Sequence, residues 1–586
     1  MLRQPIDAAR GYTLEKLRSD LVAGLTVAVV SVPSAMAYAL IAGVPAEYGL
    51  YTLIVQCLIG SLLNSQPFLS VGPVNTHALL VAAVATRAMT QLGELGPAEY
   101  GARYLELVVL LTLLKGVLQL GLATIGLGAA VRFVSQSVIV GFVAGAGILI
   151  AVGQIPGFLG IAAVRSASDW PGLVGAVQRA APHLADTSGP SVAVGLVCLA
   201  LLLLGRRLPS RFPSALVAVV VGAGAVVVAG WSASDLLLVR PLPEGLPGFR
   251  LPVMSWTLAE ALLGGALALS LLGLLESFSI GKTIARQTGQ RINPNQELLS
   301  QGVTNAISSF FQCIPGSGSF ARSALNFQAG AATLYAGVFN SVFVAAILLL
   351  FSPLARLIPM ASLAAILFVI AYELVDWRAI VRMARASRPD MFVCLATLGA
   401  TLFIPLAYAV FVGILLNVSL YLQRSSRLQL VEMVPAPDGS FAERPLGTEA
   451  GPKLVVFLQL EGNLFFGVAD ELQDQLSLGS AGARAVVLRL KRTLSVDSTV
   501  LSVLDQFIRD MQGRGASVLL CGVRPELALR LRRYGLVDLL GEEGLFESEP
   551  GIFVSARRAL ARAHRLARAA ASERSETARG ADAYEI

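Results

Sequence analysis

The chain has 586 residues, of which 55% are hydrophobic and 14% are charged, and its mean hydropathy is +0.69. These values exclude an ordinary soluble domain and indicate an integral membrane protein. The net charge of +7 would also suit a nucleic-acid-binding protein. However, most basic residues lie in short segments between apolar stretches, where they orient membrane spans, so no nucleic-acid partner is expected.

Apolar stretches of helical length recur from residue 21 to residue 422. Crossing the hydrocarbon core takes about 20 such residues, so the two longest stretches are expected to hold two spans each. With two broken helices included, we expect about 14 spans. The stretches are 21–41, 50–63, 74–90, 105–127, 131–152, 190–205, 214–230, 257–281, 297–312, 319–350, 354–371 and 391–422.

Basic residues are concentrated in some of the connecting segments and absent from others, such as 41–49. Because positively charged loops stay in the cytoplasm, both termini are expected there, which requires an even number of spans. The first apolar stretch lacks a small-residue cleavage pattern, so no removed signal peptide is predicted. We expect a multi-pass protein of the plasma membrane, the inner membrane in a bacterium. The basic residues are Arg3, Arg10, Lys16, Arg18, Arg206, Arg207, Arg211, Lys282, Arg286, Arg291, Arg378, Arg382, Arg385 and Arg388.

Two segments with glycine and proline, SVGPVNTHALL (70–80) and IPGSGSFARSALN (314–326), precede apolar runs in the two halves of the chain. In hydrocarbon, a backbone NH group without a partner costs several kcal/mol. A helix that starts at membrane depth therefore favours an anion at its N-terminus, which carries partial positive charge. Paired broken helices in two halves are typical of a transporter's substrate site.

The first residues of the two expected half-helices are the candidate anion ligands. Arg322 keeps its charge at every working pH and would attract the anion, although a structural salt bridge with Glu276 is the alternative. Asn75 and Thr76 are backbone and side-chain donors, or only helix caps. The candidates are Val74, Asn75, Thr76, Phe320, Ala321 and Arg322.

Further candidates come from the first and eighth spans. Pro33 is expected to interrupt the first span and to turn Ser34 and Tyr38 toward the site. Glu276 lies in the apolar run ALALSLLGLLESFSIG, where a charge costs ~2.5 to 3.5 kcal/mol at the bilayer centre. A desolvated glutamate is readily protonated, so we expect Glu276 to carry a coupling proton. Sodium binding, or a fixed pairing with Arg322 or with Lys282, is the alternative.

One histidine is a candidate pH sensor. His77 follows Thr76 in the first half-helix and titrates near neutral pH when unperturbed. A packed, hydrogen-bonded histidine without a functional role is the alternative reading.

The sequence changes character after Arg424. Residues 425–452 contain prolines and glycine and are interpreted as a linker, and residues 453–571 alternate strand-like and helix-like segments, which predicts an α/β domain. Residues 1–19 are expected to be a cytoplasmic N-terminal segment, 20–424 the membrane domain and 572–586 a disordered tail. Asp497 and Ser498 precede a predicted helix, where either residue would be a good cap.

Three separate segments resemble the sulfate permease (SulP) family. They are DLVAGLTVAVVSVPSAMAYALIAGVPAEYGLY (20–51), GKTIARQTGQRINPNQELLSQGVTNAISSFFQCIPGSGSFARSALN (281–326) and VDSTVLSVL (496–504). The resemblance implies about 14 transmembrane helices in a seven-plus-seven inverted repeat with core and gate subdomains, a C-terminal STAS domain and a homodimer. It also implies that the anion lies between the half-helices of the third and tenth spans.

The resemblance carries expectations for three individual residues. An acidic residue of the eighth span, here Glu276, would bind sodium or a proton. Ser498 matches a segment that is phosphorylated in bacterial regulators of the STAS fold, so it is a candidate phosphorylation site. Ser34 departs from the family, which often has a larger polar residue there, and this puts the transfer of any particular family substrate in doubt.

No catalytic pattern is present in the sequence. It lacks a Walker loop, a metal-spaced cluster and a Ser/His/Asp set, and its five cysteines show no CxxC spacing, so we expect neither an enzyme, a metal site nor a cofactor. The expected function is secondary active transport of a small anion, namely sulfate, bicarbonate, chloride or a dicarboxylate. Proton coupling is favoured over sodium coupling. The alternatives are an uncoupled or sodium-coupled exchanger or channel-like carrier, and a membrane-anchored anion sensor that signals through STAS.

Overall fold

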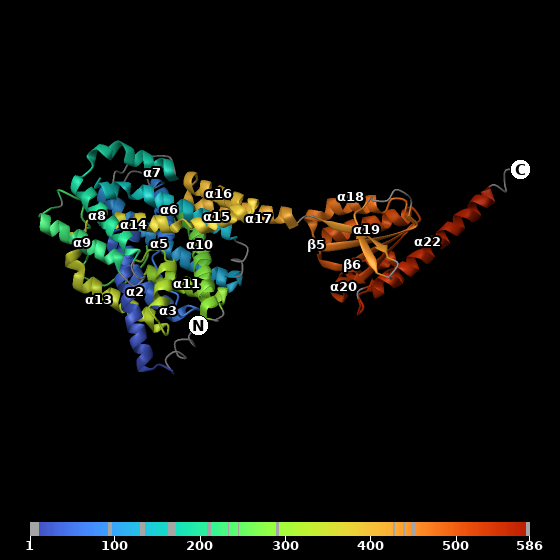
Figure 1. The fold of residues 1–586 in the computed structure, drawn as a ribbon, viewed down its shortest axis with the longest axis horizontal. Coiled ribbons are helices and arrows are strands. Elements are labelled where there is room, and N and C mark those ends of the chain that lie inside the picture. The colour runs from blue at the N-terminus through green and yellow to red at the C-terminus, as the bar shows by residue number, and fades with distance from the viewer. Residues whose placement is uncertain are drawn as a thin grey trace. The chain divides into compact units, whose positions relative to one another are not determined.

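The computed structural model divides into two compact units, Met1–Asn417 and Val418–Ile586 (Figure 1). Each unit is described by itself below. The structure describes residues 11–91, 96–128, 135–161, 172–207, 213–232, 234–243, 245–288, 292–425, 428–436, 440–446, 453–551 and 553–581.

The first unit is almost entirely helical. Each apolar stretch predicted from the sequence corresponds to a helix in it, and the stretches 319–350 and 391–422 each hold two, as expected. The helices are α2 (Leu14–Ile41), α3 (Ala46–Leu63), α4 (Asn75–Thr90), α5 (Pro97–Thr124), α6 (Gln136–Leu159), α7 (Gly172–Ala180), α8 (Gly189–Gly205), α9 (Ser214–Ala229), α10 (Trp256–Thr288), α11 (Pro294–Ser309), α12 (Phe320–Gln328), α13 (Tyr335–Phe351), α14 (Met360–Leu374), α15 (Trp377–Ala386), α16 (Arg388–Phe403) and α17 (Leu406–Ser425). The 3-10 helices η2 (Ala181–Asp186) and η3 (Ser352–Leu357) connect some of them.

In the part of the chain that the structure describes, eight helices are long and apolar enough to cross a membrane. The apolar helices α8 and α9 are shorter, and α4 and α12 are the half-helices that follow the broken segments. Length and composition therefore support a multi-pass membrane unit, while the total of about 14 spans remains a prediction.

Small residues allow the helices of this unit to pack closely. A Cβ atom at Gly116 of α5 would lie 2.4 Å from the backbone nitrogen of Ala306 on α11, and one at Gly49 of α3 would lie 2.0 Å from the carbonyl oxygen of Ala35 on α2. Neither contact leaves room for a side chain. Close backbone approach of this kind is the usual way in which membrane helices associate, because lipid gives them little hydrophobic drive.

The predicted interruption of the first span at Pro33 is not observed. Helix α2 continues from Leu14 to Ile41 through this proline. Proline removes one hydrogen bond from the helix, but neighbouring helices can hold the remaining turns in place in a membrane protein.

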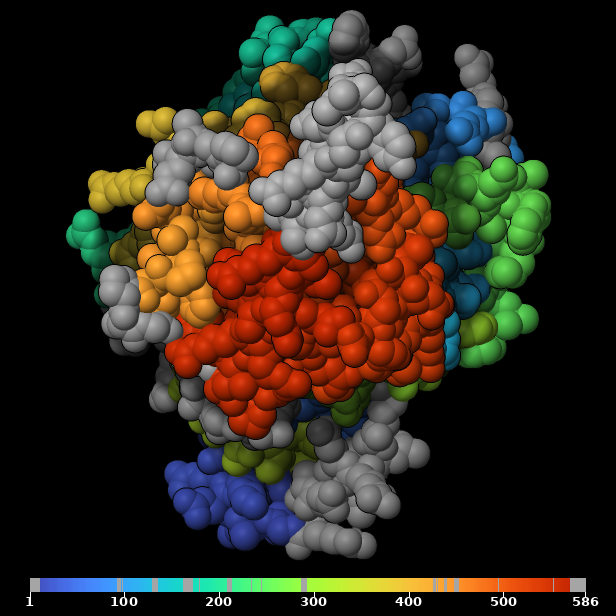
Figure 2. Space-filling model, turned by 90° about the vertical axis from the view of Figure 1, so that its right-hand side faces the viewer, coloured from blue at the N-terminus to red at the C-terminus, as the bar shows by residue number. Residues whose placement is uncertain are grey.

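The second unit is a six-stranded sheet with helices on both faces. The order is β4-β3-β5-β6-β7-β8, in which β5 to β8 are parallel and β3 and β4 form an antiparallel edge. On the face that Figure 2 shows, the described residues of this unit are drawn in orange to red. The strands are β3 (Gln429–Pro435), β4 (Phe441–Arg444), β5 (Val455–Leu464), β6 (Ala485–Val496), β7 (Ser517–Val523) and β8 (Leu545–Glu547).

Each face of this sheet is covered by its own apolar cluster. Alternate residues of β5, β6 and β7 pack on one face against α18 (Ala469–Gly479), α19 (Ser498–Gly513), α20 (Pro525–Tyr534) and α21 (Leu536–Leu540). The opposite face packs against buried alanines of the long C-terminal helix α22 (Val554–Ala581). This alternation follows from the two-residue period of a strand.

The structure differs from two of the predicted boundaries. The segment 425–452, interpreted as a linker, contains β3 and β4, and β3 pairs with β5 through Leu430 and Leu460. Pro435 suggested a linker but pairs with Phe441 at the end of the β3–β4 ladder. The tail predicted to be disordered from residue 572 is helical as far as Ala581, because its alanine, glutamate and arginine residues favour helix. Residues 582–586 lie outside the described part.

Candidate anion site

The two broken segments lie side by side and pair with each other. Strand β1 (Val71–Gly72) is antiparallel to β2 (Ser317–Gly318), and Ser319 donates its backbone NH to the carbonyl oxygen of Ser70 over 3.0 Å. Helix α4 begins three residues after β1, and α12 begins two residues after β2. Because antiparallel strands run in opposite directions, the two half-helices leave this small sheet in opposite directions with their N-termini beside it.

Arg322 lies at the junction of the two half-helices. Its side chain is 5% exposed, and Nη1 donates to the carbonyl oxygen of Pro73 over 2.7 Å. Within the described residues, Nε and Nη2 have no hydrogen-bond partner. A Cβ atom on Gly72 would lie 3.1 Å from Nη2. The charge is thus buried against β1 with two nitrogen atoms left without acceptors, an arrangement that costs free energy until an acceptor is present.

Side chains satisfy part of the first turn of each half-helix. Asn75 Oδ1 accepts from the backbone NH of Thr76 over 2.8 Å, and Ser319 Oγ accepts from that of Arg322 over 3.4 Å. Asn75 is the first residue of α4 and Val74 is its N-cap, so this contact is a local hydrogen bond and no capping bond, and the roles expected for Asn75 and Thr76 stay predictions. The remaining NH groups of each first turn have no acceptor within their own helix, as at the N-terminus of any helix.

The other candidate ligands are placed around this junction. Val74 is the N-cap of α4 and is buried, whereas Phe320 is 54% exposed and Ala321 is also exposed at the start of α12. Tyr38 is buried in α2 and close enough to Arg322 to interact with its charge. Ser34 is half-buried one turn earlier on α2.

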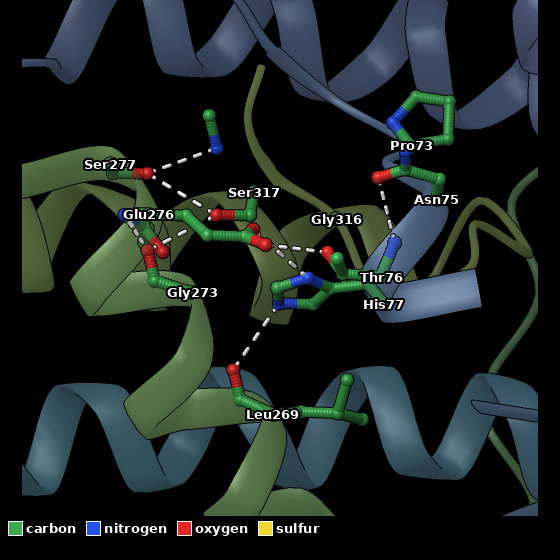
Figure 3. Close-up of polar contacts among 12 residues, drawn as sticks. Pro73, Asn75, Thr76, His77, Leu269, Gly273, Glu276, Ser277, Gly316 and Ser317 are labelled. Atoms are coloured by element: carbon green, nitrogen blue, oxygen red, sulfur yellow. Dashed lines mark hydrogen bonds and ion pairs between the residues drawn. The ribbon is translucent and has the colours of Figure 1, made fainter. Parts of the chain in front are cut away.

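Glu276 on α10 binds to the first half-helix rather than to a basic residue (Figure 3). Thr76 Oγ1 donates to Glu276 Oε1 over 2.5 Å, and His77 Nδ1 lies 3.3 Å from Glu276 Oε2. The alternative pairings with Arg322 and with Lys282 are absent from the described part of the chain. Arg322 donates through Nη1 to the carbonyl oxygen of Pro73, and Lys282 is exposed on α10.

The tautomer of His77 follows from its other contact. His77 is fully buried, and its Nε2 lies 3.3 Å from the carbonyl oxygen of Leu269. A carbonyl oxygen only accepts, so Nε2 carries a hydrogen. The lone pairs of Nδ1 and of an ionised Glu276 would then face each other across 3.3 Å. One proton between the imidazole and the carboxylate removes this repulsion, so the pair is suited to hold a proton next to Thr76.

The sequence analysis missed Lys115, although this residue, like Glu276, is a charged residue within an apolar stretch. The lysine lies within the apolar stretch 105–127, and its side chain is fully buried on α5. Its ammonium group donates to the carbonyl oxygen of Gly316, the residue before β2. Any charge in such a stretch marks a functional or paired position.

A second missed residue, Asp20, fixes the end of the second half-helix. Its buried carboxylate accepts from the backbone NH groups of Ala332 over 2.7 Å and Thr333 over 2.9 Å. Asp20 therefore ties α2 to the turn that follows α12.

Buried amides hold the second broken segment. Asn305 on α11 accepts from the backbone NH of Gly316 over 3.0 Å, and Gln56 on α3 donates to the carbonyl oxygen of Ile314 over 3.0 Å. These contacts satisfy backbone groups that would otherwise lack partners where the helix is interrupted.

In the second unit, Ser498 is exposed at the first position of α19. The helix is capped instead by Asp497, whose Oδ1 accepts from the backbone NH of Val500 over 2.9 Å and whose Oδ2 accepts from that of Phe466 over 2.6 Å. The capping alternative thus belongs to Asp497, and phosphorylation of Ser498 stays a prediction.

The family model described as "Sulfate permease family" matches residues 17–397, and the "STAS domain" model matches residues 450–550. The chain belongs to the sulfate permease family. Membership identifies it as an anion transporter rather than an enzyme, and its second unit as a STAS domain.

Curated relatives match over nearly the whole chain. The "Putative sulfate transporter YvdB" of Bacillus subtilis is 27% identical over 92% of this chain and 97% of its own length. The "Sodium-independent sulfate anion transporter" of Bos taurus is 29% identical over 88% of this chain and 85% of its own length.

Solved structures share the fold. Murine Slc26a9 in the inward-facing state has a TM-score of 0.86 at 19% identity, covering 95% of this chain and 93% of its own. The transmembrane domain of the cyanobacterial bicarbonate transporter BicA has a TM-score of 0.58 at 24% identity, covering 70% of this chain and 98% of its own. These likenesses support the predicted fold class, an α-helical membrane domain followed by an α/β STAS domain.

Proposed function

We propose that this protein is a secondary active transporter that binds a small anion between the N-termini of α4 and α12 and moves it by alternating access. The observation that carries the proposal is Arg322, buried at the junction with Nε and Nη2 free of acceptors among the described residues. Phosphate-like and carboxylate anions match the two-pronged donor geometry of a guanidinium. Backbone NH groups of the two first turns would supply the remaining donors.

The substrate class includes sulfate, bicarbonate, chloride and small dicarboxylates. Sulfate and bicarbonate come first because the names of the relatives from Bacillus subtilis and Bos taurus refer to sulfate and that of the cyanobacterial protein refers to bicarbonate. Sulfate has four acceptor oxygens, so it can accept more hydrogen bonds from Arg322 and the NH groups than chloride can.

We infer that transport is coupled to protons through Glu276. The carboxylate accepts from Thr76 and faces His77, and both residues belong to the half-helix that carries the anion donors. A proton held there adds positive charge beside the bound anion, so the two ligands favour each other's binding. His77 shares this proton, which gives it a role in pH response.

Uptake of radiolabelled sulfate and bicarbonate into proteoliposomes tests both parts of the proposal. An inward proton gradient is expected to accelerate saturable uptake by the wild-type protein. Glu276→Gln is expected to abolish that acceleration, whereas Glu260→Gln, an exposed carboxylate on the same helix, is the matched control and should retain it.

Three other outcomes would redirect the proposal. Saturable flux that Glu276→Gln leaves equally responsive to pH would mean that coupling does not pass through this carboxylate. Flux without any gradient dependence would favour an exchanger or channel-like carrier. Tight anion binding without flux would favour a membrane-anchored sensor.

We also propose a homodimer with both termini and the STAS domain in the cytoplasm. The positively charged segments before α2 and after α8 and α14 support this orientation, because such loops remain on the cytoplasmic side. Mass measurement in detergent tests the dimer, and protease accessibility in sealed vesicles tests the orientation.

A further inference from the structure

Three polar groups converge on Gly273 of α10, one turn before Glu276. A Cβ atom on this glycine would lie 3.0 Å from Gln301 Oε1, 3.1 Å from His77 Nε2 and 3.3 Å from Lys115 Nζ. Lys115 is fully buried and donates to the carbonyl oxygen of Gly316. Its ammonium is thus held between α5, α10 and the second broken segment.

The charged groups around Lys115 can be assigned from each neighbouring helix. Helix α10 contributes Glu276, which is close enough to interact with the ammonium charge, and α4 contributes His77, which is fully buried. Helix α11 carries one acidic residue, Glu297, and this side chain accepts instead from the NH and Oγ of Ser65 over 3.3 and 3.0 Å. Glu276 is therefore the acidic residue of these helices whose charge acts on Lys115, although its direct contacts are with Thr76 and His77.

A coupling sodium ion would need the same oxygen atoms. In transporters with broken helices, carbonyl groups of the unwound segment and nearby carboxylates coordinate the cation. Here Lys115 occupies the carbonyl of Gly316, and the two oxygens of Glu276 face Thr76 and His77. A second cation beside the ammonium would also be repelled strongly in this buried setting. The carbonyl of Gly316 and the carboxylate of Glu276 therefore do not form a fitting site for a sodium ion.

We propose that Lys115 is a resident cation that takes the place of a coupling sodium ion, so that anion binding and transport are independent of sodium. This inference rests on the proposed transport function. The ammonium of Lys115 supplies the positive charge beside Glu276 and the second broken segment that a bound sodium ion would otherwise supply. Lys115 is a positioning residue in this scheme, because it acts through Glu276 and Gly316 and touches no anion.

Sodium dependence provides the test. Wild-type uptake of sulfate at a fixed proton gradient should be equal in sodium and in N-methylglucamine buffers. Lys115→Met should lower uptake by about tenfold or more, as expected when an interaction required for the bound state is removed. Lys282→Met, which removes an exposed lysine from α10, is the control and should transport normally. Stimulation of the wild-type protein by sodium, or unchanged uptake by Lys115→Met, would overturn the proposal.

A binding measurement separates replacement of sodium from a purely structural role. Lys115→Ala removes the ammonium from the carbonyl oxygen of Gly316, to which Asn305 Nδ2 still donates over 3.3 Å. The second acceptor position of this oxygen is then open to a cation, so sodium should raise the melting temperature of this variant, since a ligand that binds the native state stabilises it. Sodium should leave the melting temperature of the wild-type protein unchanged. Equal shifts in both proteins, or no shift in either, would contradict the replacement.

A double variant covers the case in which the single variant is too unstable to assay. Lys115→Met leaves the half-buried Glu276 without this nearby positive charge, so Lys115→Met/Glu276→Gln should recover most of the lost thermal stability. Additive losses would show that the two residues do not act together and would overturn the inference. Absence of flux from wild-type protein would refute the proposed function, yet the melting comparisons would still decide the role of Lys115.

Discussion

Arg322 on α12 donates a hydrogen bond over 2.7 Å to the carbonyl oxygen of Pro73, which lies 249 residues earlier in the sequence. This bond joins the two broken segments, so the charged group of one half of the membrane unit is positioned by the backbone of the other. Any motion that separates α4 from α12 also moves the guanidinium away from β1. Charge and geometry at the candidate site are therefore set together.

Replacing Arg322 tests this dependence directly. Arg322→Gln removes the charge and should abolish anion uptake, while Arg322→Lys keeps the charge but lacks the planar fork that reaches Pro73 and an anion at once. We expect Arg322→Lys to raise KM by about tenfold or more, because the loss of one charge-assisted hydrogen bond weakens anion binding by about this factor. Initial rates of sulfate uptake over a range of concentrations measure both effects.

Arg378→Gln is the control for these variants, because it removes an exposed arginine from α15. Normal uptake is expected from it. If Arg322→Gln transported sulfate as well as this control, Arg322 would have only a structural role.

Much of the membrane unit could be predicted from the sequence, because each apolar stretch has to become a helix and each broken segment has to satisfy its backbone groups. Val74 and Arg322 lie close to the junction for this reason. The pairing partners could not be predicted in the same way. That Glu276 would bind Thr76 and His77 rather than Arg322 depends on how α10 packs against α4, which no local pattern specifies.

The errors at the C-terminal unit have a different cause. Proline and glycine mark a hairpin as readily as a linker, so the pairing of Pro435 with Phe441 was not visible in composition. Lys115, in contrast, gave a usable signal. A lysine in an apolar stretch predicts a functional or paired charge, as Glu276 does, but its contact with the carbonyl of Gly316 depends on tertiary packing.

Gly316 is predicted to tolerate no side chain. A Cβ atom there would lie 1.8 Å from Gln56 Oε1 and 2.5 Å from the carbonyl oxygen of Gly72, so Gly316→Ala must displace the amide or β1. We expect loss of about 1 to 3 kcal/mol of stability, as for other overpacked positions, together with loss of transport. Thermal denaturation in detergent and sulfate uptake report the two effects.

Gly264→Ala is the matched substitution on α10, where a Cβ atom would meet no atom within 4 Å. It should leave transport intact and leave stability unchanged or slightly higher, because alanine favours helix over glycine. Comparable damage from both substitutions would mean that the contact at Gly316 is not the cause.

The cap of α19 distinguishes two neighbouring residues of the STAS domain. Asp497→Ala removes the acceptor for the NH groups of Val500 and Phe466, so it should destabilise this domain by about 1 to 2 kcal/mol. Ser498→Ala should have little effect on stability, because Ser498 is exposed and does not cap the helix. Chemical denaturation of the full-length protein, followed by hydrogen exchange of α19, measures both. Equal destabilisation by the two variants would contradict the assignment of the cap.

Cys521 reports whether α22 stays on the sheet. Its side chain on β7 is fully buried against α22, and burial raises the pKa of its thiol to about 12, although nearby Arg489 favours the thiolate. A thiol exposed by unfolding has a pKa of about 8.5. The neutral thiol thus stabilises the folded state fully below about pH 8.5, and this stability is lost as the pH rises from there toward 12. At pH 9, iodoacetamide should label Cys521 only when α22 opens, because the thiolate is the reactive form.

Two substitutions on α22 make this test specific. Ala563 is fully buried in the same cluster as Cys521, so Ala563→Glu places a carboxylate against the sheet and should detach the helix. Labelling of the Cys521 peptide at pH 9, followed by mass spectrometry, should then accelerate by about tenfold or more, since opening that costs less free energy populates the reactive form more. Ala561→Glu changes an exposed position of the same helix and should leave the rate at the wild-type value. Equal labelling rates in all three proteins would mean that α22 does not control access to this face of the sheet. A helix that protects Cys521 by packing has to lose that protection when a charged residue is placed in its buried face.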